Sequence, residues 1–285
     1  THFFVIDGAP HKRAYSLCVP EGGTPACTIK NIAGGAVSAY ISGHLKPGDR
    51  YWVLGPSGEF TLSEGVEPLA FVAAGSGITP VMSLIETALA RAPQRPIHLL
   101  YSSRTPAETI FAARLQQLAE RHASLRLSLV YTQSESRVDG ARINTWASQI
   151  PGATFYLCGP SGLMESAERG LRLLQIPPAR IKREVFLAAA RETHARPTEP
   201  QEIYFQKSGK RVEQRPGESI LDAALRESVA INFSCTVGGC GSCKVRVTGG
   251  ESALSEPNCL TPEEKAQGFT LACSAFAVQP IVVEA

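Results

Sequence analysis

Three cysteines and three glycines lie within nine residues of the chain, in the segment Cys235-Thr-Val-Gly-Gly-Cys-Gly-Ser-Cys243. The spacing is C-x4-C-x2-C, and Cys273 follows after 29 intervening residues. Thiolates at this spacing hold a plant-type [2Fe–2S] cluster, which needs four of them. Glycines allow the loop to take positive φ values, and their N–H groups can donate to sulfur. We therefore predict that Cys235, Cys240, Cys243 and Cys273 ligate a [2Fe–2S] cluster.

Zinc and disulfides are the alternative uses of these cysteines. Zinc sites usually combine two C-x2-C pairs, which this triplet fits poorly. No secretion signal is visible in the sequence, so we expect a cytoplasmic protein, where clustered cysteines serve metal or redox chemistry. Three cysteines outside this pattern are interpreted as structural thiols: Cys18, Cys27 and Cys259.

Length and composition describe an ordinary globular protein of two or three domains. The chain has 285 residues, 44% hydrophobic and 19% charged, with a net charge of +2. That charge is too small to indicate binding to nucleic acid or to an acidic membrane. The longest uncharged run, residues 68–85, has Gly75, Gly77 and Pro80 at its centre, so we expect a strand, a turn and a helix there instead of a membrane span.

Strands and helices are predicted to alternate between residues 68 and 186, which indicates an open parallel α/β sheet. After the first strand, the glycine turn Gly75-Ser-Gly77 opens a helix, an arrangement that aims N–H groups at a pyrophosphate. The predicted strands are 68–74, 97–103, 125–132, 154–158 and 182–186, and the predicted helices are 81–91, 106–122 and 161–174.

The segments AAGSGITP and YLCGPSGLM together resemble the nicotinamide domain of the ferredoxin–NADP reductase superfamily. This resemblance implies that the glycine turn binds pyrophosphate and that the cysteine of C-G-P lies beside the nicotinamide carbon that gives up the hydride. An inert buried thiol is the alternative interpretation of that cysteine. The residues so assigned are Gly75, Gly77, Thr79, Pro80, Cys158, Gly159 and Pro160, with Thr79 and Cys158 as catalytic residues.

Selection between NADH and NADPH stays open. The second predicted strand ends in Ser102-Ser-Arg104-Thr105 and offers no acid for a ribose hydroxyl. Arg104 either binds a 2′-phosphate or is simply solvated. Glu184 either approaches the nicotinamide or is a surface acid.

A hydride carries two electrons and a [2Fe–2S] cluster accepts one, so we expect a flavin to stand between them. The segments 13–18, 34–38 and 55–60 read as strand-like and are punctuated by glycine, as in a small antiparallel β-barrel. They resemble the R-x-Y-S and G-G-x-x-S motifs of the flavin domain in the same superfamily, and their form favours FAD, with FMN as the alternative.

By that resemblance Arg13 binds the flavin phosphate, Tyr15 packs against the isoalloxazine, and Ser16 hydrogen-bonds near N5 as a catalytic residue. The segment 34–38 presents N–H groups to a phosphate, and Phe186 covers one flavin face. Barrel core for Tyr15 and Phe186 and an ordinary turn at 34–35 are the alternatives. The flavin residues are Arg13, Ala14, Tyr15, Ser16, Gly34, Gly35, Val37, Ser38 and Phe186.

Residues 202–285 resemble a plant-type ferredoxin domain of β-grasp-like α+β fold, on the segments NFSCTVGGCGSCKVRV and LACSAF. The predicted domains are a flavin-binding β-barrel (1–65), shorter at its N-terminus than in family members by about two strands, a NAD(P)-binding α/β domain (66–187), a linker (188–201) and the ferredoxin domain (202–285).

This order of domains resembles the reductase components of multicomponent bacterial oxygenases, which include the reductases of phenylacetyl-CoA epoxidase, phthalate dioxygenase and vanillate demethylase. The resemblance implies that electrons pass from NADH or NADPH through the flavin to the cluster and on to an oxygenase partner of Rieske or di-iron type. A stand-alone reductase of small acceptors and a redox-sensing module are the alternatives.

Overall fold

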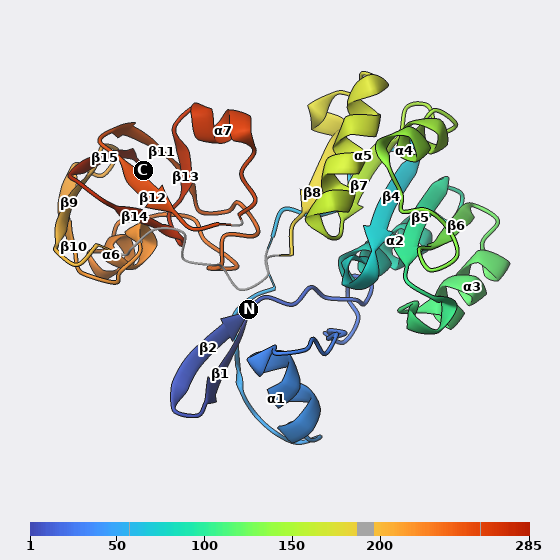
Figure 1. Cartoon of the computed structure of the whole chain (residues 1–285), viewed down its shortest axis with the longest axis horizontal. Coiled ribbons are helices and arrows are strands. Elements are labelled where there is room, and N and C mark those ends of the chain that lie inside the picture. Colours follow the sequence, from blue (N-terminus) through green and yellow to red (C-terminus); the bar gives the residue numbers. More distant parts are fainter. Residues whose placement is uncertain (57, 187–196, 257) are drawn as a thin grey trace. The chain divides into compact units, whose positions relative to one another are not determined.

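The computed structural model of the chain describes residues 1–56, 58–186, 197–256 and 258–285 (Figure 1). These residues form two compact units. The first unit holds 1–14, 46–59 and the described residues from 197 to 285, and the second holds 15–45 and 60–186. Most of the predicted linker, 188–201, lies outside the described residues. The predicted flavin segment 1–65 is shared between the units, and the predicted domain boundaries stay a prediction.

The first residues form a small antiparallel sheet in the strand order β2-β1-β3. Its strands are β1 (His2–Ile6), β2 (Ala9–Arg13) and β3 (Trp52–Val53). Asp7 and Gly8 both have positive φ, as a two-residue hairpin loop requires, and Ile6 pairs directly with Ala9. An antiparallel sheet is therefore present where the sequence predicts one, with three strands among the described residues.

The strand-like interpretation of residues 34–38 is wrong, because helix α1 (Ala36–His44) begins there. Gly34 has a φ of 74° and turns the chain, and Gly35 caps the helix. Apolar residues at 37, 40 and 41 follow the helical period and not the strand period. The strand expected over 13–18 ends at Arg13, and the described residues of 55–60 form no strand.

Five parallel strands form the sheet of the second unit, in the order β6-β5-β4-β7-β8. The fold class predicted for this part of the chain is confirmed. Neighbouring strands extend from β4 in both directions, so β4 lies at a switch point, beside which ligands bind in open α/β sheets. The strands are β4 (Leu69–Ala74), β5 (Ile97–Ser103), β6 (Leu125–Tyr131), β7 (Thr154–Cys158) and β8 (Ile181–Glu184).

Four helices cover the two faces of this sheet (Figure 1). One buried cluster joins Leu69 and Phe71 of β4 to α2 and α3, and a second joins Ala70 and Val72 to α4 and α5. Successive side chains of β4 thus enter the two clusters on opposite faces of the sheet, which explains why every residue of the strand is apolar. The helices are α2 (Ile78–Arg91), α3 (Ala112–Arg121), α4 (Gly140–Ala147) and α5 (Ser161–Leu173).

Two details of this unit differ from the sequence-based prediction. The helix expected over 106–122 is divided into a 3-10 turn (Pro106–Glu108) and α3, because Phe111 takes a left-handed φ of 62°. Helix α4 was not predicted; Asp139 caps it by accepting a hydrogen bond from Arg142 N–H.

The C-terminal part of the first unit is a five-stranded sheet in the order β10-β9-β15-β11-β13, with a helix packed on it. Only β9 and β15 run parallel, so the sheet is mixed and β-grasp-like as predicted. Ser219 and Asp222 form the capping box that begins α6. The elements are β9 (Gln201–Phe205), β10 (Lys210–Gln214), α6 (Ile220–Arg226), β11 (Lys244–Gly249), β12 (Ser252–Leu254), α7 (Pro262–Ala266), β13 (Phe269–Leu271), β14 (Ala275–Ala277) and β15 (Ile281–Glu284).

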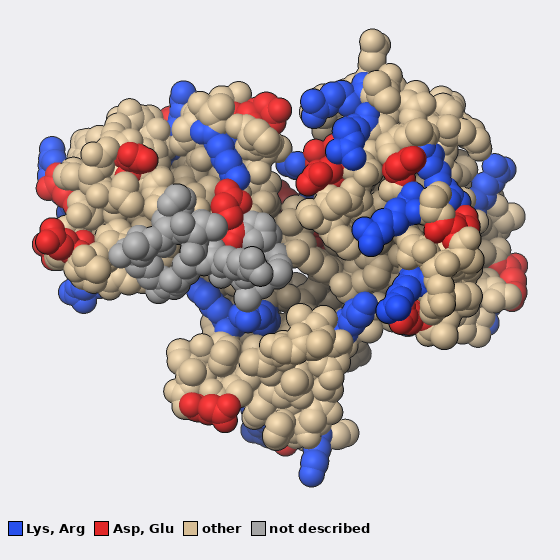
Figure 2. Space-filling view, viewed as in Figure 1, with Lys and Arg blue, Asp and Glu red and all other residues tan. Residues whose placement is uncertain are grey.

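Charged side chains of both signs are mixed on the face of the molecule shown in Figure 2, in keeping with the net charge of +2. Within the described ranges, no helix combines the length and the apolar character needed to cross a bilayer.

Candidate functional site

Antiparallel strands bring the distant fourth cysteine to the cysteine loop. Cys243 directly precedes β11, and one residue, Ala272, separates Cys273 from the end of β13. The register pairs Lys244 with Leu271, and Ala272 N–H donates to the carbonyl of Cys243 at 3.0 Å. The 29-residue spacing is therefore closed by β-sheet pairing, which fixes the fourth cysteine more rigidly than a loop would.

The loop offers several backbone N–H groups to cysteine sulfur. Val237 N–H and Gly239 N–H lie 3.5 and 3.3 Å from Cys235 Sγ. The N–H groups of Cys235 and Ser242 each lie 3.5 Å from Cys240 Sγ. Such donors stabilise negative charge on sulfur, which metal-bound thiolates carry.

Glycine conformation in this loop matches the prediction at two of three positions. Gly238 and Gly241 have φ of 77° and 79°. Gly239 is not among the positive-φ residues of the described chain; Thr236, with φ of 54°, takes a left-handed conformation instead.

The four predicted ligands interact as two pairs. A hydrogen bond with the Cys235 thiol is the main cause that lowers the pKa of Cys240 to about 4, and the same bond raises the pKa of Cys235. The Cys273 thiol likewise lowers the pKa of Cys243, and its own pKa is raised. In each pair, the hydrogen bond from one thiol therefore stabilises negative charge on the other sulfur.

The pairing of the cysteines corresponds to the ligand set of a two-iron cluster. A [2Fe–2S] cluster with four thiolates takes two of them at each iron. The donor set of two thiol pairs surrounded by N–H groups is thus suited to that cluster.

In the second unit, the glycine turn and the C-G-P turn touch through their backbones. A Cβ added at Gly77 would lie 2.2 Å from the carbonyl oxygen of Cys158 and 2.9 Å from the nitrogen of Gly159. A Cβ at Gly159 would lie 3.2 Å from the nitrogen of Ala74. Two segments about 80 residues apart in sequence are therefore joined at the carboxyl edge of β4 and β7, where open α/β sheets bind ligands.

A small cavity of about 230 Å³ opens at this junction. It brings together the predicted residues Gly75, Gly77, Gly159, Pro160 and Phe186. Lys30 also lines it, and sequence reasoning missed this residue because no motif marks a lysine so far from the glycine turn. A cation beside a glycine turn at a helix start suits an anionic ligand.

Cys158 is fully buried, and burial together with the negative charge of Glu184 raises the pKa of its thiol. The thiol is therefore neutral at physiological pH, which suits a role in positioning and not as a nucleophile. Glu184 ends β8 beside Cys158 and accepts a hydrogen bond from Ser16 Oγ. The structure thus brings Ser16, Cys158 and Glu184 together, and it favours the nicotinamide-side interpretation of Glu184 over that of a free surface acid.

Thr79 and Pro80 occupy the first turn of α2 and are buried. The Thr79 hydroxyl donates to the carbonyl of Ser76 at 3.0 Å, so it shapes the glycine turn. Arg104 is exposed after β5, and within the described ranges its guanidinium makes no ion pair. It does not line the cavity beside the glycine turn.

The predicted flavin residues are divided between the two units. Arg13 and Ala14 end the first hairpin, whereas Tyr15, Ser16 and the segment 34–38 belong to the second unit. Val37 and Ser38 are buried in the first turn of α1, and Ser38 Oγ accepts from Ile32 N–H and donates to Gly35 O. The segment 34–38 therefore forms a helix N-terminus, which offers N–H groups to an anion.

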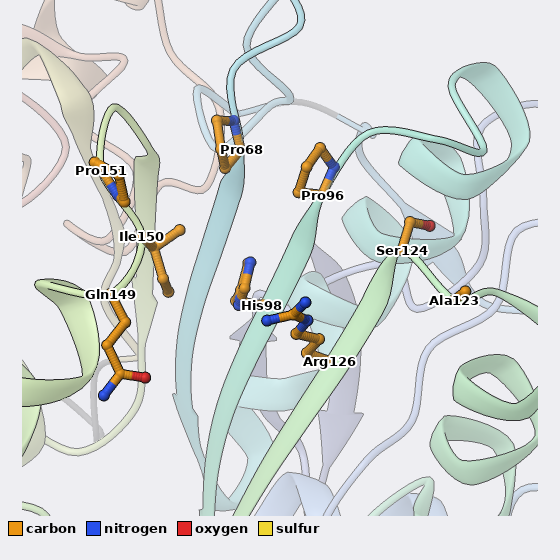
Figure 3. Close-up of a pocket in the computed structure, with 9 residues that line it drawn as sticks. All are labelled: Pro68, Pro96, His98, Ala123, Ser124, Arg126, Gln149, Ile150 and Pro151. Atoms are coloured by element: carbon orange, nitrogen blue, oxygen red, sulfur yellow. The ribbon is translucent and has the colours of Figure 1, made fainter.

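A larger cavity, of about 390 Å³, lies at the opposite edge of the parallel sheet (Figure 3). His98 and Arg126 reach into it from neighbouring strands, and Pro68 and Pro96 stand at the strand starts. It contains none of the predicted site residues and lies at the amino ends of the strands, away from the edge where such sheets bind ligands.

Two domain families match the chain. Residues 203–278 match the 2Fe-2S iron-sulfur cluster binding domain, and residues 71–169 match the oxidoreductase NAD-binding domain. The chain is 30% identical over 307 residues to a component of the 1,2-phenylacetyl-CoA epoxidase of Escherichia coli (strain K12). That alignment covers 98% of this chain and 84% of the epoxidase component. The chain belongs to the family of [2Fe–2S] oxygenase reductases.

Solved structures agree with this membership. One of them is phthalate dioxygenase reductase, described as a modular structure for electron transfer from pyridine nucleotides to [2Fe–2S]. The match covers 100% of this reductase and 86% of that chain, with a TM-score of 0.61 and 24% identity, which shows the shared fold. The flavohem-like FAD/NAD binding domain of nitric oxide dioxygenase from Vibrio cholerae O1 biovar El Tor matches 65% of this reductase and 82% of that domain, with a TM-score of 0.54 and 26% identity.

The predicted family, fold class and enzyme class are confirmed: this reductase is an oxidoreductase of three structural parts. Its cofactors are FAD and a [2Fe–2S] cluster, and NAD(P)H is its substrate.

Proposed function

We propose that this reductase passes electrons from NADH or NADPH through FAD to a [2Fe–2S] cluster and then to an oxygenase of Rieske or di-iron type. The observation that carries the proposal is the pairing of four cysteine sulfurs in a loop rich in N–H donors, on a chain whose glycine and C-G-P turns meet at one sheet edge. Bound FAD supplies the conversion between two-electron and one-electron chemistry.

In this proposal the glycine turn binds the dinucleotide. Gly75 and Gly77 let the chain approach the pyrophosphate, and the Thr79 hydroxyl, held by Ser76 O, fixes the turn. Pro80 lies in the first turn of the helix, whose positive end would face the phosphates. Gly159 and Pro160 line the same cavity, and Lys30 adds a positive charge to it.

The neutral Cys158 thiol and the Ser16 hydroxyl frame the place where nicotinamide and flavin meet. Glu184 accepts a hydrogen bond from the Ser16 hydroxyl and so fixes the direction in which the Ser16 oxygen presents its lone pairs. Phe186, 37% exposed beside the glycine turn, has apolar surface available to cover a ring. The ring stays covered from water when a flat apolar side chain lies on it.

We assign the remaining flavin contacts to Arg13, Ala14, Tyr15 and the segment 34–38. The N-terminus of α1, with Gly34, Gly35, Val37 and Ser38, supports a phosphate contact. Arg104 is the residue we propose for a 2′-phosphate, since its guanidinium is exposed and makes no ion pair among the described residues. Cys235, Cys240, Cys243 and Cys273 are the proposed cluster ligands.

We propose a cytoplasmic location, because reduced thiols are kept available for cluster assembly there. The domain boundaries that we propose are 1–65, 66–187 and 202–285, with 188–201 as a linker.

An anaerobic titration of the purified holoprotein with NADH, and separately with NADPH, tests the proposal. Flavin absorbance should bleach first and cluster absorbance should follow, and the nucleotide that does this at lower concentration is the preferred one. The control is Cys240→Ser, which should prevent cluster reduction and leave NAD(P)H-dependent ferricyanide reduction intact. A colourless protein, or loss of both activities in a folded Cys240→Ser chain, would refute the electron order.

A second arm separates an oxygenase partner from a stand-alone reductase. The reduced protein is mixed with Rieske-type and di-iron oxygenase components, and NADH consumption coupled to product formation is measured. Turnover with cytochrome c and with neither oxygenase class would contradict the partner proposal.

A further inference from the structure

Thr236 combines two unfavourable features inside the cluster loop. Its φ of 54° lies in the left-handed region, where β-branched residues are strained. Its hydroxyl oxygen is buried, and among the described residues no group hydrogen-bonds to it. Buried polar atoms without partners are rare in folded proteins and often mark an unseen ion or ligand.

The backbone conformation of Thr236 has an evident use. It lets the N–H groups of Val237 and Gly239 converge on Cys235 Sγ, at 3.5 and 3.3 Å. A glycine would take the same conformation without strain, as Gly238 and Gly241 do nearby. Backbone geometry alone therefore does not explain a threonine at this position, and the side chain needs a reason of its own.

The hydroxyl has the right chemistry and place to supply that reason. Thr236 follows the predicted ligand Cys235 directly, and a threonine hydroxyl donates one hydrogen bond. The cluster that Cys235 would ligate brings sulfur acceptors to the neighbourhood of this residue. Hydrogen bonds to cluster sulfur are one of the determinants of the reduction potential.

We propose that the Thr236 hydroxyl donates a hydrogen bond to a sulfur of the bound [2Fe–2S] cluster and thereby raises its reduction potential. The inference rests on the proposed ligation by the four cysteines. Reduction adds one electron to the cluster and no proton, and no bond in the protein forms or breaks. Because a hydrogen bond to sulfur strengthens as negative charge grows, the donor stabilises the reduced form more than the oxidised form.

Thr236→Val and Thr236→Ser test the proposal as a matched pair in the full-length holoprotein. Valine keeps the shape and the strain and removes only the hydroxyl, whereas serine keeps the hydroxyl. We expect Thr236→Val to shift the reduction equilibrium three- to tenfold toward the oxidised cluster, which is about 30–59 mV for a one-electron couple. Thr236→Ser should stay close to the unaltered protein. Potentials come from anaerobic redox titration followed by electron paramagnetic resonance.

A second readout follows the proton itself. The reduced unaltered protein and Thr236→Ser should show one exchangeable proton coupling in electron–nuclear double resonance that Thr236→Val lacks. Equal potentials and equal couplings in the valine and serine chains, at equal iron content, would overturn the proposal and leave the cluster assignment intact. If the unaltered protein binds no iron and sulfide, the proposed function fails instead.

Cluster loading gives the remaining outcomes. Loss of iron from Thr236→Val and Thr236→Ala with normal loading of Thr236→Ser would show that the hydroxyl is needed to hold the cluster, and would support the proposal. Loss of iron from all three chains would assign Thr236 to the backbone conformation alone and overturn it.

Discussion

Gly77→Ala is the sharpest test of the junction between the glycine turn and the C-G-P turn. The new Cβ would lie 2.2 Å from Cys158 O and 2.5 Å from Cys158 C, and real Cβ atoms essentially never come within 3.0 Å of another heavy atom. The two turns must therefore separate by about 0.8 Å, and neither contact is a flexible side chain that could move away. Overpacking of this kind costs about 2–3 kcal/mol, near the upper end of its usual range.

The consequence for binding follows from the place of the contact. A displacement of about 1 Å in a reacting geometry costs up to about 100-fold in rate, so we expect kcat/KM for NADH-dependent ferricyanide reduction to fall about 10- to 100-fold. The melting temperature should fall by about 4–12 °C. Both are measured beside the control Gly162→Ala in the first turn of α5, where a Cβ meets nothing within 4 Å.

The result that refutes the reasoning is a Gly77→Ala protein with the melting temperature and the NADH kinetics of the unaltered chain. A fall in stability with unchanged kinetics would place the nicotinamide elsewhere than at this junction.

Two further predictions concern charge and burial. Arg226→Ala removes the guanidinium that donates to Glu218 at 3.1 Å and lowers the pKa of that carboxyl. A lowered carboxyl pKa stabilises the fold above the unfolded pKa, and this contribution is lost as the pH falls through the folded pKa. The variant should therefore be less stable than the unaltered chain at pH 7 in urea titrations, and the difference should shrink as the pH falls through the lowered pKa of Glu218. A difference that does not change with pH would contradict this. Because the Cys158 thiol is buried and protonated, it should resist iodoacetamide at pH 8 in the native protein and react after unfolding. Mass spectrometry of the labelled peptides measures this. Labelling of Cys158 in the native protein would contradict a buried, neutral thiol.

Local chemical signals carried most of what the sequence could predict. The apolar run at 68–74 and the glycine turn that follows it depend on neighbouring residues alone, and both appear where they were predicted, as β4 and the start of α2. The cysteine spacing belongs to the same class, because a loop that must curl around four sulfurs leaves few spacings open.

Signals that depend on tertiary contact were missed or misjudged. Residues 34–38 read as strand-like, yet a positive φ at Gly34 turns the chain into α1. The left-handed conformation of Phe111 divides the helix expected over 106–122. That conformation is rare for a bulky aromatic residue, so the sequence does not predict it. Lys30 reaches the glycine turn from about 45 residues upstream, and only the fold places it there. The hydrogen bond of Ser16 with Glu184 spans 168 residues and likewise has no local signature.

The two redox regions give cysteine opposite electrostatic surroundings, and burial alone does not explain the difference. Cys158 and Cys243 are both buried, yet the pKa of the first is raised and that of the second lowered. Cys158 has desolvation and a nearby carboxylate acting against its thiolate, whereas Cys243 receives a hydrogen bond from the Cys273 thiol that outweighs desolvation. Hydrogen-bond donors therefore stabilise negative charge on Cys243, whereas Cys158 keeps a neutral thiol, as the nicotinamide site that we propose requires.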